Sequence, residues 1–366
     1  MSTVEKLYRT PLYEEHVGLG AKMVPFGGWE MPVQYEGILL EHQQTRSAAA
    51  IFDISHMGEF IVEGGCLETG LDRLVTMPVV DMPVNSSRYG MLCNDNGGVI
   101  DDLIVFRLEE EKWFIVVNAA TTTKDAGHFR KNLARPGCFR DVSPEIGKID
   151  LQGPLAREVL KDLAAGIAKL DYFKFDFFDL LGENVLISRT GYTGELGYEI
   201  FYPWDKTVEL WRKLLADSRV RPAGLGARDI LRLEKGYSLY GHELEESITP
   251  LEAGLERFVD LKKDFIGRQA LLKQSQTGVS RINVGLLSAT RRSPREGQKL
   301  YAPSGEEIGE VSSGTFSPCV NKGIGLGFVR KDLAVKQTPV FFGDARQKSE
   351  AVVTGKIFYK GGSLKD

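Results

Sequence analysis

The chain has 366 residues, of which 42% are hydrophobic and 26% are charged, a composition typical of a soluble globular protein with two or three domains. Its 46 Lys and Arg residues against 50 Asp and Glu residues leave a formal charge of −4, which argues against a general nucleic-acid binder. No apolar run approaches the ~18–20 residues of a membrane span, and residues 1–9 lack the pattern of a signal or transit peptide, so we expect a cytoplasmic protein without membrane association.

The first half of the chain is predicted to mix helices and strands. Residues 37–52 carry apolar side chains at helical spacing. Two strand-like runs, 103–108 and 113–118, flank a charged tetrapeptide and predict a hairpin. A helix is then expected from Thr122 to about Leu133, since threonine and aspartate suit its first turn.

The next part of the chain continues this pattern. Pro154 is suited to the first position of a helix. Residues 184–189 and 198–202 predict a second hairpin around the glycine-rich segment 191–197. Residues 205–217 have the apolar spacing of an amphipathic helix.

The last 90 residues differ in character. The polar stretch 275–280 predicts a linker, and only short strands punctuated by glycine and proline follow it, which indicates a small closed or sandwiched β-domain. The expected strands are 282–287, 308–313, 324–329, 340–342 and 351–359. The sequence therefore predicts an α+β region over 1–275 and a β-domain over 281–360.

The familiar signatures of catalysis and cofactor binding are absent. The chain has no GxxxxGK[ST] phosphate loop, no HExxH and no GxSxG. The glycines at 323, 325 and 327 resemble a dinucleotide loop weakly, but no helix follows, so close strand packing is the simpler explanation. The four cysteines and five histidines are scattered without metal-ligand spacing, and no metal site is predicted.

Two adjacent acids form the first candidate site. Asp101 and Asp102 follow Gly97 and Gly98 at the start of an apolar strand. Neighbouring strand residues point to opposite faces, so only one of the two aspartates can face a given pocket. A solvated turn before a strand is the alternative, and it stays open on these residues alone.

A glycine-rich loop between two strands forms the second candidate site. Residues 189–200 read Arg-Thr-Gly-Tyr-Thr-Gly-Glu-Leu-Gly-Tyr-Glu-Ile, and Tyr192 and Tyr198 offer aromatic faces with hydroxyl tips. Glu199 is a carboxylate in an otherwise apolar strand. It either meets solvent or accepts a pair of N–H groups, such as the amino-pyrimidine edge of a pterin.

Three cations at helical spacing form the third candidate site. Arg228, Arg232 and Lys235 recur at i, i+4 and i+7 and predict a cationic stripe on one helical face. The stripe is either a solvated face with local ion pairs or a site for an anionic ligand, since arginine suits carboxylates.

Six segments in order carry a resemblance to one family. They are Phe-Gly-Gly-Trp-Glu-Met-Pro-Val at 26–33, Phe-Asp-Ile-Ser-His-Met-Gly at 52–58, Gly-Gly-Val-Ile-Asp-Asp-Leu-Ile-Val at 97–105, Arg-Thr-Gly-Tyr-Thr-Gly-Glu at 189–195, Gly-Leu-Gly-Ala-Arg-Asp at 224–229 and Ser-Gly-Thr-Phe-Ser-Pro at 313–318. Together they resemble the aminomethyltransferases, the T-proteins of the glycine cleavage system, over nearly the whole chain.

The resemblance implies a fold and a reaction. The fold is a three-domain clover-leaf around a folate channel, with one α+β subdomain from roughly 1–50 and 145–275, another from 51–144, and a C-terminal barrel-like domain. The reaction moves a one-carbon unit from the aminomethyl-lipoyl arm of the H-protein to tetrahydrofolate, and yields 5,10-methylenetetrahydrofolate, ammonia and dihydrolipoyl H-protein. Tetrahydrofolate is then a co-substrate and lipoylated H-protein the partner, and no metal, flavin, nicotinamide, nucleic acid or membrane is expected.

The resemblance also implies roles for single residues. Asp101 matches the family's catalytic carboxylate, Glu199 the glutamate that grips the pterin, and Arg228 an arginine that contacts folate. The further residues expected to line the pocket are Met57, Tyr89, Asn118, Tyr192, Tyr237 and Tyr359. One family arginine has its counterpart within 291–295, at a position that the sequence leaves open.

The residues suit this chemistry, and two alternatives remain. A folate nitrogen is the nucleophile, so no Ser or Cys nucleophile is needed, and a carboxylate can stabilise the developing positive charge. A folate-dependent demethylase would share the fold. A non-catalytic folate-binding protein would carry a KGCYxGQE-type motif, whereas residues 233–238 here read Leu-Glu-Lys-Gly-Tyr-Ser, without cysteine.

Overall fold

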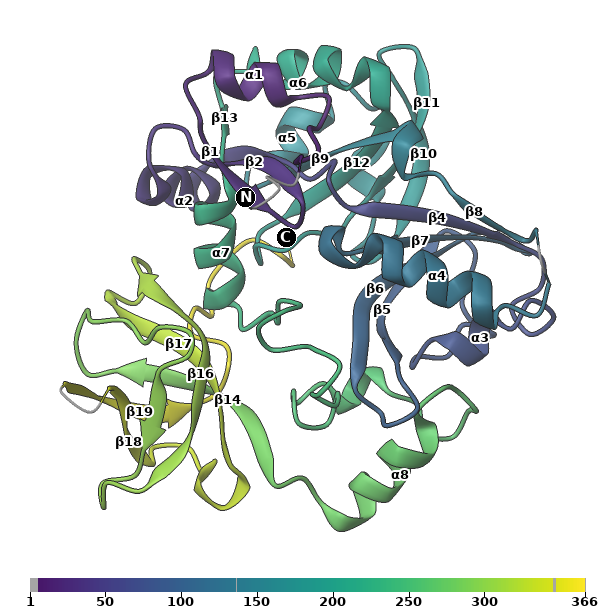
Figure 1. Cartoon of the computed structure of the whole chain (residues 1–366). Coiled ribbons are helices and arrows are strands. Elements are labelled where there is room, and N and C mark those ends of the chain that lie inside the picture. The colour runs from purple at the N-terminus through teal and green to yellow at the C-terminus, as the bar shows by residue number, and fades with distance from the viewer. Residues whose placement is uncertain (1–5, 136, 345–346, 366) are drawn as a thin grey trace.

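Three units, each built on its own sheet, are arranged around the centre of the molecule (Figure 1). The computed structural model describes residues 6–135, 137–344 and 347–365, so the expectation for residues 1–9 falls largely outside it. None of the helices in this described part is both long enough and apolar enough to cross a bilayer.

The first unit holds a six-stranded sheet in the order β10-β11-β12-β9-β3-β13, antiparallel except where β13 joins β3. Its core packs α6 against the strands through the fully buried Leu210, Trp211 and Leu214. The strands are β3 (Ala49–Asp53), β9 (Ile146–Gln152), β10 (Phe175–Leu180), β11 (Glu183–Ser188), β12 (Gly197–Pro203) and β13 (Val220–Pro222), with the separate hairpin β1 (Lys22–Phe26) and β2 (Trp29–Gln34). The helices are α1 (Tyr13–Gly18), α2 (Ile38–Ser47), α5 (Ala156–Leu160), α6 (Thr207–Leu215) and α7 (Leu225–Glu234).

The expected elements of this unit are confirmed with one change. The hairpin of β11 and β12 and the helix α6 form where predicted, and α5 follows Pro154 as a short helix. The helical pattern over 37–52 is wrong in its second half, because α2 ends at Ser47 and residues 49–53 form β3. Every residue of β3 is buried between its neighbours β9 and β13, and the position in the sheet outweighs the helix propensity of the alanines.

The second unit is a five-stranded antiparallel sheet in the order β5-β6-β7-β4-β8. Helix α4 covers one of its faces through Ala126 and Phe129. The predicted hairpin of β6 and β7 and the helix after it are confirmed. The elements are β4 (Gly58–Glu63), β5 (Ser86–Cys93), β6 (Val99–Glu109), β7 (Lys112–Val117), β8 (Phe139–Asp141), α3 (Leu71–Leu74) and α4 (Thr122–Asn132).

The other face of this sheet packs against the first unit. Phe106 of β6 lies 5.4 Å from Phe175 and 5.8 Å from Phe201 between ring centroids, and Phe114 of β7 lies 5.1 Å from Phe201. Side chains share this inter-sheet face at every second position along β6 and β12. Residues in register with Phe106 and Phe201 therefore point into the space between the two units.

The third unit is a closed barrel of six strands, which confirms the predicted β-domain. Its strands are β14 (Arg281–Ser288), β15 (Lys299–Tyr301), β16 (Glu307–Ser317), β17 (Lys322–Arg330), β18 (Pro339–Gly343) and β19 (Lys348–Thr354). A Cβ at Gly323 would lie 2.2 Å from the carbonyl oxygen of Arg292, and one at Gly325 would lie 2.7 Å from that of Ser313. These glycines serve close strand packing, as predicted.

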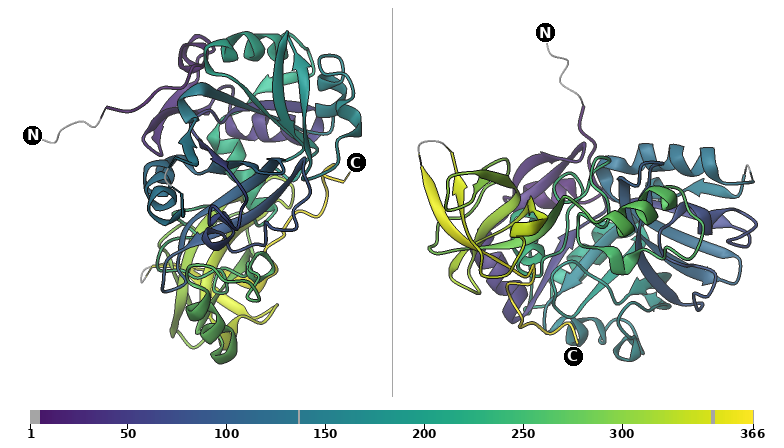
Figure 2. Two further views of the ribbon diagram at one scale, coloured as in Figure 1. Left: turned by 90° about the vertical axis from the view of Figure 1, so that its right-hand side faces the viewer. Right: turned by 90° about the horizontal axis from the view of Figure 1, so that it is seen from below.

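Two segments differ from their expected ends. Helix α8 (Arg268–Thr277) runs through the first half of the predicted linker, and the predicted strand 351–359 stops at Thr354. The chain then returns from the barrel to the first unit (Figure 2), where the backbone N–H of Phe358 donates to the carbonyl of Glu234 at 2.9 Å.

The division of the α+β region also differs from the expected one. Residues 51–53 lie in the first sheet, not the second. The segment 240–277 packs on the second unit: the backbone N–H of Val99 donates to the carbonyl of Ile248 at 2.9 Å, and Leu271 packs with Cys93 and Phe265. Chain order alone could not reveal these non-local contacts.

Candidate active site

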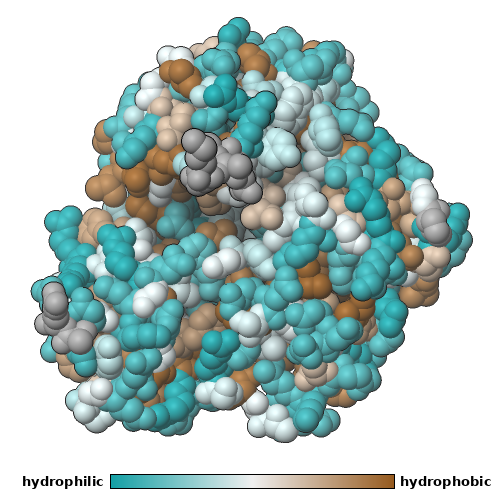
Figure 3. Space-filling model, viewed as in Figure 1, coloured by the Kyte–Doolittle hydropathy of each residue, from teal (hydrophilic) through white to brown (hydrophobic). Residues whose placement is uncertain are grey.

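The three units come together near the centre of the molecule (Figure 1), and Figure 3 shows the hydropathy of its front face. Strands β6, β9 and β12, helix α7 and the loop 189–196 carry polar side chains that contact one another or their neighbours there. Asp101 and Asp102 are neighbours on β6, so they point to opposite faces of the strand and only one of them can face the first unit.

Asp101 and Asp102 point to opposite faces of the second sheet, as predicted. Asp101 is fully buried on the side of α4, where Thr121 Oγ1 donates to its Oδ2 at 2.8 Å. Asp102 is half-buried and lies on the inter-sheet face, where the hydroxyl of Tyr89 donates to its Oδ2 at 2.9 Å. The side-chain amide of Asn118 bridges the pair, with its Nδ2 2.9 Å from Asp101 Oδ1 and 2.8 Å from Asp102 Oδ1.

The start of β6 is held in place by a close backbone contact. A Cβ at Gly98 would lie 1.9 Å from the carbonyl oxygen of Glu246, so only glycine allows the loop before the two aspartates to pack there. The geometry thus favours Asp102 as the carboxylate that a ligand between the two units would meet. Asp101 lies behind it.

The acids of this cluster hold protons at higher pH than usual. Burial and then the charge of Asp101 raise the pKa of Asp102 to about 7. The same two causes raise the pKa of Asp125, on α4, to about 9. Burial also raises the pKa of Asp101, against hydrogen bonds from Asp125, Asn118 and Thr121. Three neighbouring acids therefore share protons at neutral pH.

Asp125 gives a test of this proton sharing. Its two carboxyl oxygens accept no hydrogen bond from the described residues, so a neutral Asp125 that donates to Asp101 accounts for its burial. Asp125→Asn keeps an N–H donor, and we expect the free energy of unfolding at pH 7 to change by less than about 1 kcal/mol. Asp125→Ala removes the donor and is expected to cost about 1–3 kcal/mol. Urea denaturation measures both variants, and equal losses would contradict the assignment.

Glu199 lies on the inter-sheet face of β12, where both of its carboxylate oxygens have partners within the protein. Its Oε1 is 3.2 Å from Lys148 Nζ, and its Oε2 accepts from the hydroxyl of Thr190. Burial alone would raise the pKa of Glu199, but Lys148, Thr190 and Arg228 outweigh it and hold the pKa below its usual value. Glu199 is therefore an ionised carboxylate with only 5% of its surface exposed.

Arg228 forms a second ion pair beside the first. Its Nη1 lies 2.5 Å from Asp150 Oδ2, and its guanidinium stands 5.1 Å above the ring of Tyr192. Helix α7 can approach because Gly224 precedes it, where a Cβ would lie 2.5 Å from the backbone of Val33. Phe52 and Arg228 line a shallow surface depression.

The aromatic residues predicted for the pocket mostly gather here. Tyr192 and Tyr237 stack with ring centroids 5.7 Å apart, and the Tyr192 hydroxyl donates to the carbonyl of Ser238. Met57 Sδ lies 3.8 Å from Lys148 Nζ. The hydroxyl of Tyr89 donates to Asp102. The structure thus links most of the predicted residues in small groups of contacts: Met57 with Lys148 beside Glu199, Tyr89 and Asn118 with Asp102 next to Asp101, and Tyr192 with Arg228 and Tyr237.

The cationic stripe of α7 divides among separate partners. Arg232 is buried and binds Glu243 and Ser313, and Lys235 donates to the carbonyl of Gly361 at 2.6 Å. Of the three cations, only Arg228 reaches the neighbourhood of Glu199. The sequence reading also missed Lys148 and Asp150, although a Lys-Ile-Asp-Leu run in a buried strand was a signal for charges on one face.

Two family models match most of the chain. The model of the GCVT N-terminal domain matches residues 12–263, and that of the glycine cleavage T-protein C-terminal barrel domain matches residues 281–360. The chain belongs to the glycine cleavage T-protein family. This result confirms the resemblance drawn from the six sequence segments.

Relatives of the same family match over almost the full length. The aminomethyltransferase of Pseudothermotoga lettingae is 41% identical over 359 residues, which cover 96% of this chain and 98% of that protein. That of Halothermothrix orenii is 45% identical over 332 residues, covering 89% and 92%. The crystal structure of glycine cleavage system aminomethyltransferase T from Bartonella henselae has a TM-score of 0.91 at 36% identity and covers 98% of this chain and 99% of its own. The α+β fold class with a C-terminal barrel and the assignment as an aminomethyltransferase are thereby confirmed.

Tyr359, which the resemblance to T-proteins assigned to the pocket, lies elsewhere among the described contacts. The guanidinium of Arg46 stands 4.8 Å above its ring, and its backbone N–H donates to the carbonyl of Glu234 at 2.9 Å. None of the contacts in the described part of the chain joins it to Arg228, Glu199 or Asp102. Its pocket role stays a prediction.

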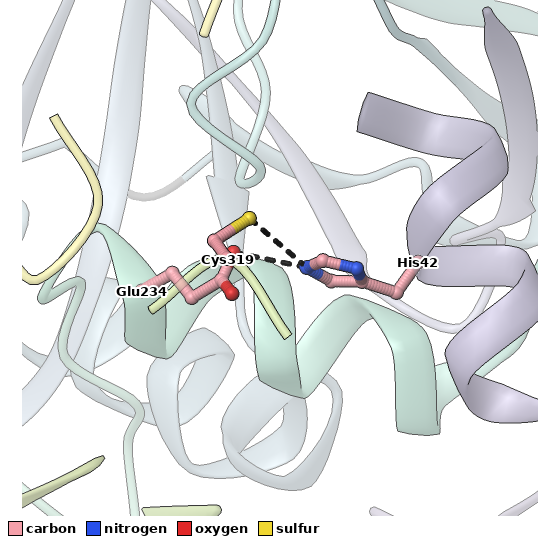
Figure 4. Close-up of side chains that lie close together, drawn as sticks. All are labelled: His42, Glu234 and Cys319. Carbon is pink, nitrogen blue, oxygen red and sulfur yellow. Dashed lines mark hydrogen bonds and ion pairs between the residues drawn. The ribbon is translucent and has the colours of Figure 1, made fainter. Parts of the chain in front are cut away.

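Potential metal ligands do meet near Tyr359. Ligand atoms of His42, Glu234 and Cys319 lie within 4.8 Å of one another (Figure 4). Glu234 already accepts from His42 at 3.0 Å, from Arg46 at 2.7 Å and from Ser317 at 2.5 Å. These donors occupy the carboxylate of Glu234. We therefore describe the cluster as a hydrogen-bonded network that connects α2, α7 and the barrel.

Proposed function

We propose that this T-protein family member transfers the one-carbon unit of an aminomethyl-lipoyl arm, carried by the H-protein, to tetrahydrofolate. The carbon–nitrogen and carbon–sulfur bonds of the aminomethyl thioether break, ammonia leaves, and the carbon becomes the bridge between two folate nitrogens. The lipoyl sulfur departs as a thiol. The observation that carries the proposal is the grouping of Glu199 and Arg228 beside Tyr192, whose hydroxyl also interacts electrostatically with Asp102.

Asp102 suits the reacting end of this site. A carboxylate there would stabilise the positive charge that develops on the one-carbon unit, and a pKa near 7 suits a group that takes up and releases protons at neutral pH. Tyr89 and Asn118 fix its two oxygens. We therefore propose Asp102 as the reacting carboxylate and Asp101 as the residue that, through Asn118, holds it in place.

Glu199 and Arg228 suit the folate itself. Each oxygen of Glu199 has one partner in the protein, which leaves a second lone pair on each for the N–H groups of a pterin. The five N–H donors of Arg228 are only partly used by Asp150, so the rest can meet an anionic or carbonyl group of the ligand. The stacked tyrosines 192 and 237 offer faces for flat rings.

One assay tests the proposal against its alternatives. The purified chain is incubated with aminomethyl-loaded H-protein and tetrahydrofolate, and ammonia and 5,10-methylenetetrahydrofolate are measured together. Equal amounts of both products are expected. Turnover of small methylated amines without H-protein would support a demethylase instead. Folate binding without turnover on any of these donors would support a non-catalytic folate-binding protein.

Glu199→Gln tests the folate site. Glutamine offers one acceptor and one donor, and the donor would oppose a pterin N–H. Tetrahydrofolate is expected to bind about 5- to 150-fold more weakly, equivalent to about 1–3 kcal/mol, with H-protein binding unchanged. Calorimetry measures both. Glu183→Gln, on the neighbouring strand β11 and paired with Lys206, is the matched control. Normal folate binding with lost H-protein binding would show that the two substrate sites are reversed.

A further inference from the structure

Lys148 is a buried cation with unused hydrogen-bonding capacity. Only 1% of its surface is exposed. Among the described residues its ammonium contacts Glu199 Oε1 at 3.2 Å and Met57 Sδ at 3.8 Å, and it stands 4.7 Å above the ring of Phe201. An ammonium has three N–H donors, whereas a thioether and a ring face are weak acceptors. A buried cation of this kind calls for a further acceptor.

The strand register places this donor directly beside the carboxylate. Strand β9 pairs antiparallel with β12, with Asp150 opposite Glu199 and Lys148 opposite Phe201. Lys148 and Glu199 are therefore diagonal neighbours on the same face of the sheet. Toward a flat ligand edge they present two acceptors, the lone pairs of the carboxylate, and next to them one donor.

This order of groups complements one particular ligand edge. A 2-amino-4-oxo-pyrimidine ring presents two donors, its amino N–H and its ring N–H, followed by one acceptor, its oxo group. A 2,4-diamino-pyrimidine ring presents an amino donor in place of that acceptor, and its neutral ring nitrogen is an acceptor in place of the ring N–H. The ammonium of Lys148 would donate to the oxo group of the first edge and would oppose the 4-amino group of the second.

We propose that Lys148 is a specificity-determining residue that donates to the oxo group of the 2-amino-4-oxo-pyrimidine ring while Glu199 accepts its two N–H groups. The inference rests on the proposed function, since it names a second contact to the same folate. It predicts discrimination between ligands that differ at a single substituent.

A simpler role for Lys148 is to neutralise Glu199. The charged and titratable groups around this pair are Arg228 on α7, Asp150 on β9, and His56 and Glu59 beside β4. Burial lowers the pKa of His56 to about 4, so His56 is uncharged at neutral pH, and burial raises the pKa of Glu59. Lys148 is the direct counter-charge of Glu199. Replacement of a purely neutralising cation would weaken binding of the 4-oxo and 4-amino ligands by the same factor and leave the ratio of their affinities unchanged.

The test compares tetrahydrofolate with tetrahydroaminopterin, which differ only in the 4-oxo or 4-amino substituent, by calorimetry on the full chain. The wild type is expected to prefer the oxo ligand by about 5- to 150-fold. This is the range expected when two buried donors face each other and neither has an acceptor. Lys148→Met should weaken tetrahydrofolate binding by a similar factor and should lower the ratio of the two affinities, leaving the part of the preference that the ring N–H contributes through Glu199. Lys148→Gln keeps a neutral donor and should retain the preference. Where Lys148→Met does not fold, Lys148→Gln decides.

The matched control is Lys263→Met. Lys263 is a largely buried lysine that pairs with Asp72 at 3.4 Å, outside this site, and its replacement should leave the affinity ratio unchanged. A wild type that binds neither ligand would overturn the proposed function itself. A wild type that binds tetrahydrofolate, with equal losses for both ligands in Lys148→Met or a lost preference in Lys148→Gln, would overturn the role of Lys148 alone.

Discussion

Asp102→Asn is expected to lower turnover by about 10²-fold or more, the scale of a lost proton-transfer or charge-stabilising group, with little change in folate affinity. Asparagine keeps the size of the side chain and can still bond to Tyr89 and Asn118. It cannot carry the negative charge that a cationic one-carbon unit needs. Steady-state kinetics with loaded H-protein and calorimetry with tetrahydrofolate separate the two effects.

Asp101→Asn is the matched control, because the two residues are neighbours that share the Asn118 amide. Asp101 is fully buried and accepts from Thr121 beside α4, so we expect its loss to lower turnover far less than that of Asp102. The resemblance had pointed to Asp101 as the catalytic carboxylate. A large loss at Asp101 with a small one at Asp102 would restore that assignment.

The pH profile gives an independent check of the same carboxylate. The pKa of Asp102 is raised to about 7, first by burial and then by the charge of Asp101. The ionised form is present above the pKa, so turnover should fall as the pH drops below about 7. In Asp101→Asn the repulsion is gone, the pKa of Asp102 should decrease, and the acid limb should move to lower pH. An unchanged limb would contradict the coupling.

The sequence located this site but could not orient it. The alternation of strand residues correctly separates Asp101 from Asp102, but which face is the pocket depends on α4 covering one side of β6 and the first sheet approaching the other. Both contacts join residues distant in the chain. Tyr359 follows the barrel and contacts Arg46 in the described part of the chain, and its role in the pocket stays a prediction.

Periodicity predicted elements well where one face is buried and less well in the middle of a sheet. The barrel strands alternate and are broken by glycine, and five of them form near the predicted ranges, although the last ends at Thr354 and β15 was not predicted. Strand β3 is buried on both faces, so it shows no alternation, and its alanines continue the helical pattern of α2. Lys148 and Asp150 alternate visibly in β9, but their partners Glu199 and Arg228 come from other parts of the chain.

The largest effect on stability is expected at Arg232. Its side chain on α7 connects the segment 237–243 with the barrel. Only 1% of its surface is exposed. It donates to Glu243 at 2.9 Å, to the carbonyl of Tyr237 at 3.0 Å and to Ser313 of the barrel at 2.9 Å. Burial would lower the pKa of Arg232, but its acidic neighbours outweigh that and keep the guanidinium charged.

Arg232→Met should therefore lower the free energy of unfolding by about 3–5 kcal/mol, because Glu243 is left as a buried carboxylate without its counter-charge. The double variant Arg232→Met with Glu243→Gln removes both charges and should recover a large part of that loss, as paired removal does in other buried ion pairs. Arg212→Met is the control: its side chain is 68% exposed and pairs with Glu15 on the surface, so it should cost less than about 1 kcal/mol. Urea denaturation followed by circular dichroism measures all three, and an equal loss in Arg232→Met and Arg212→Met would show that the buried pair does not hold α7 to the barrel.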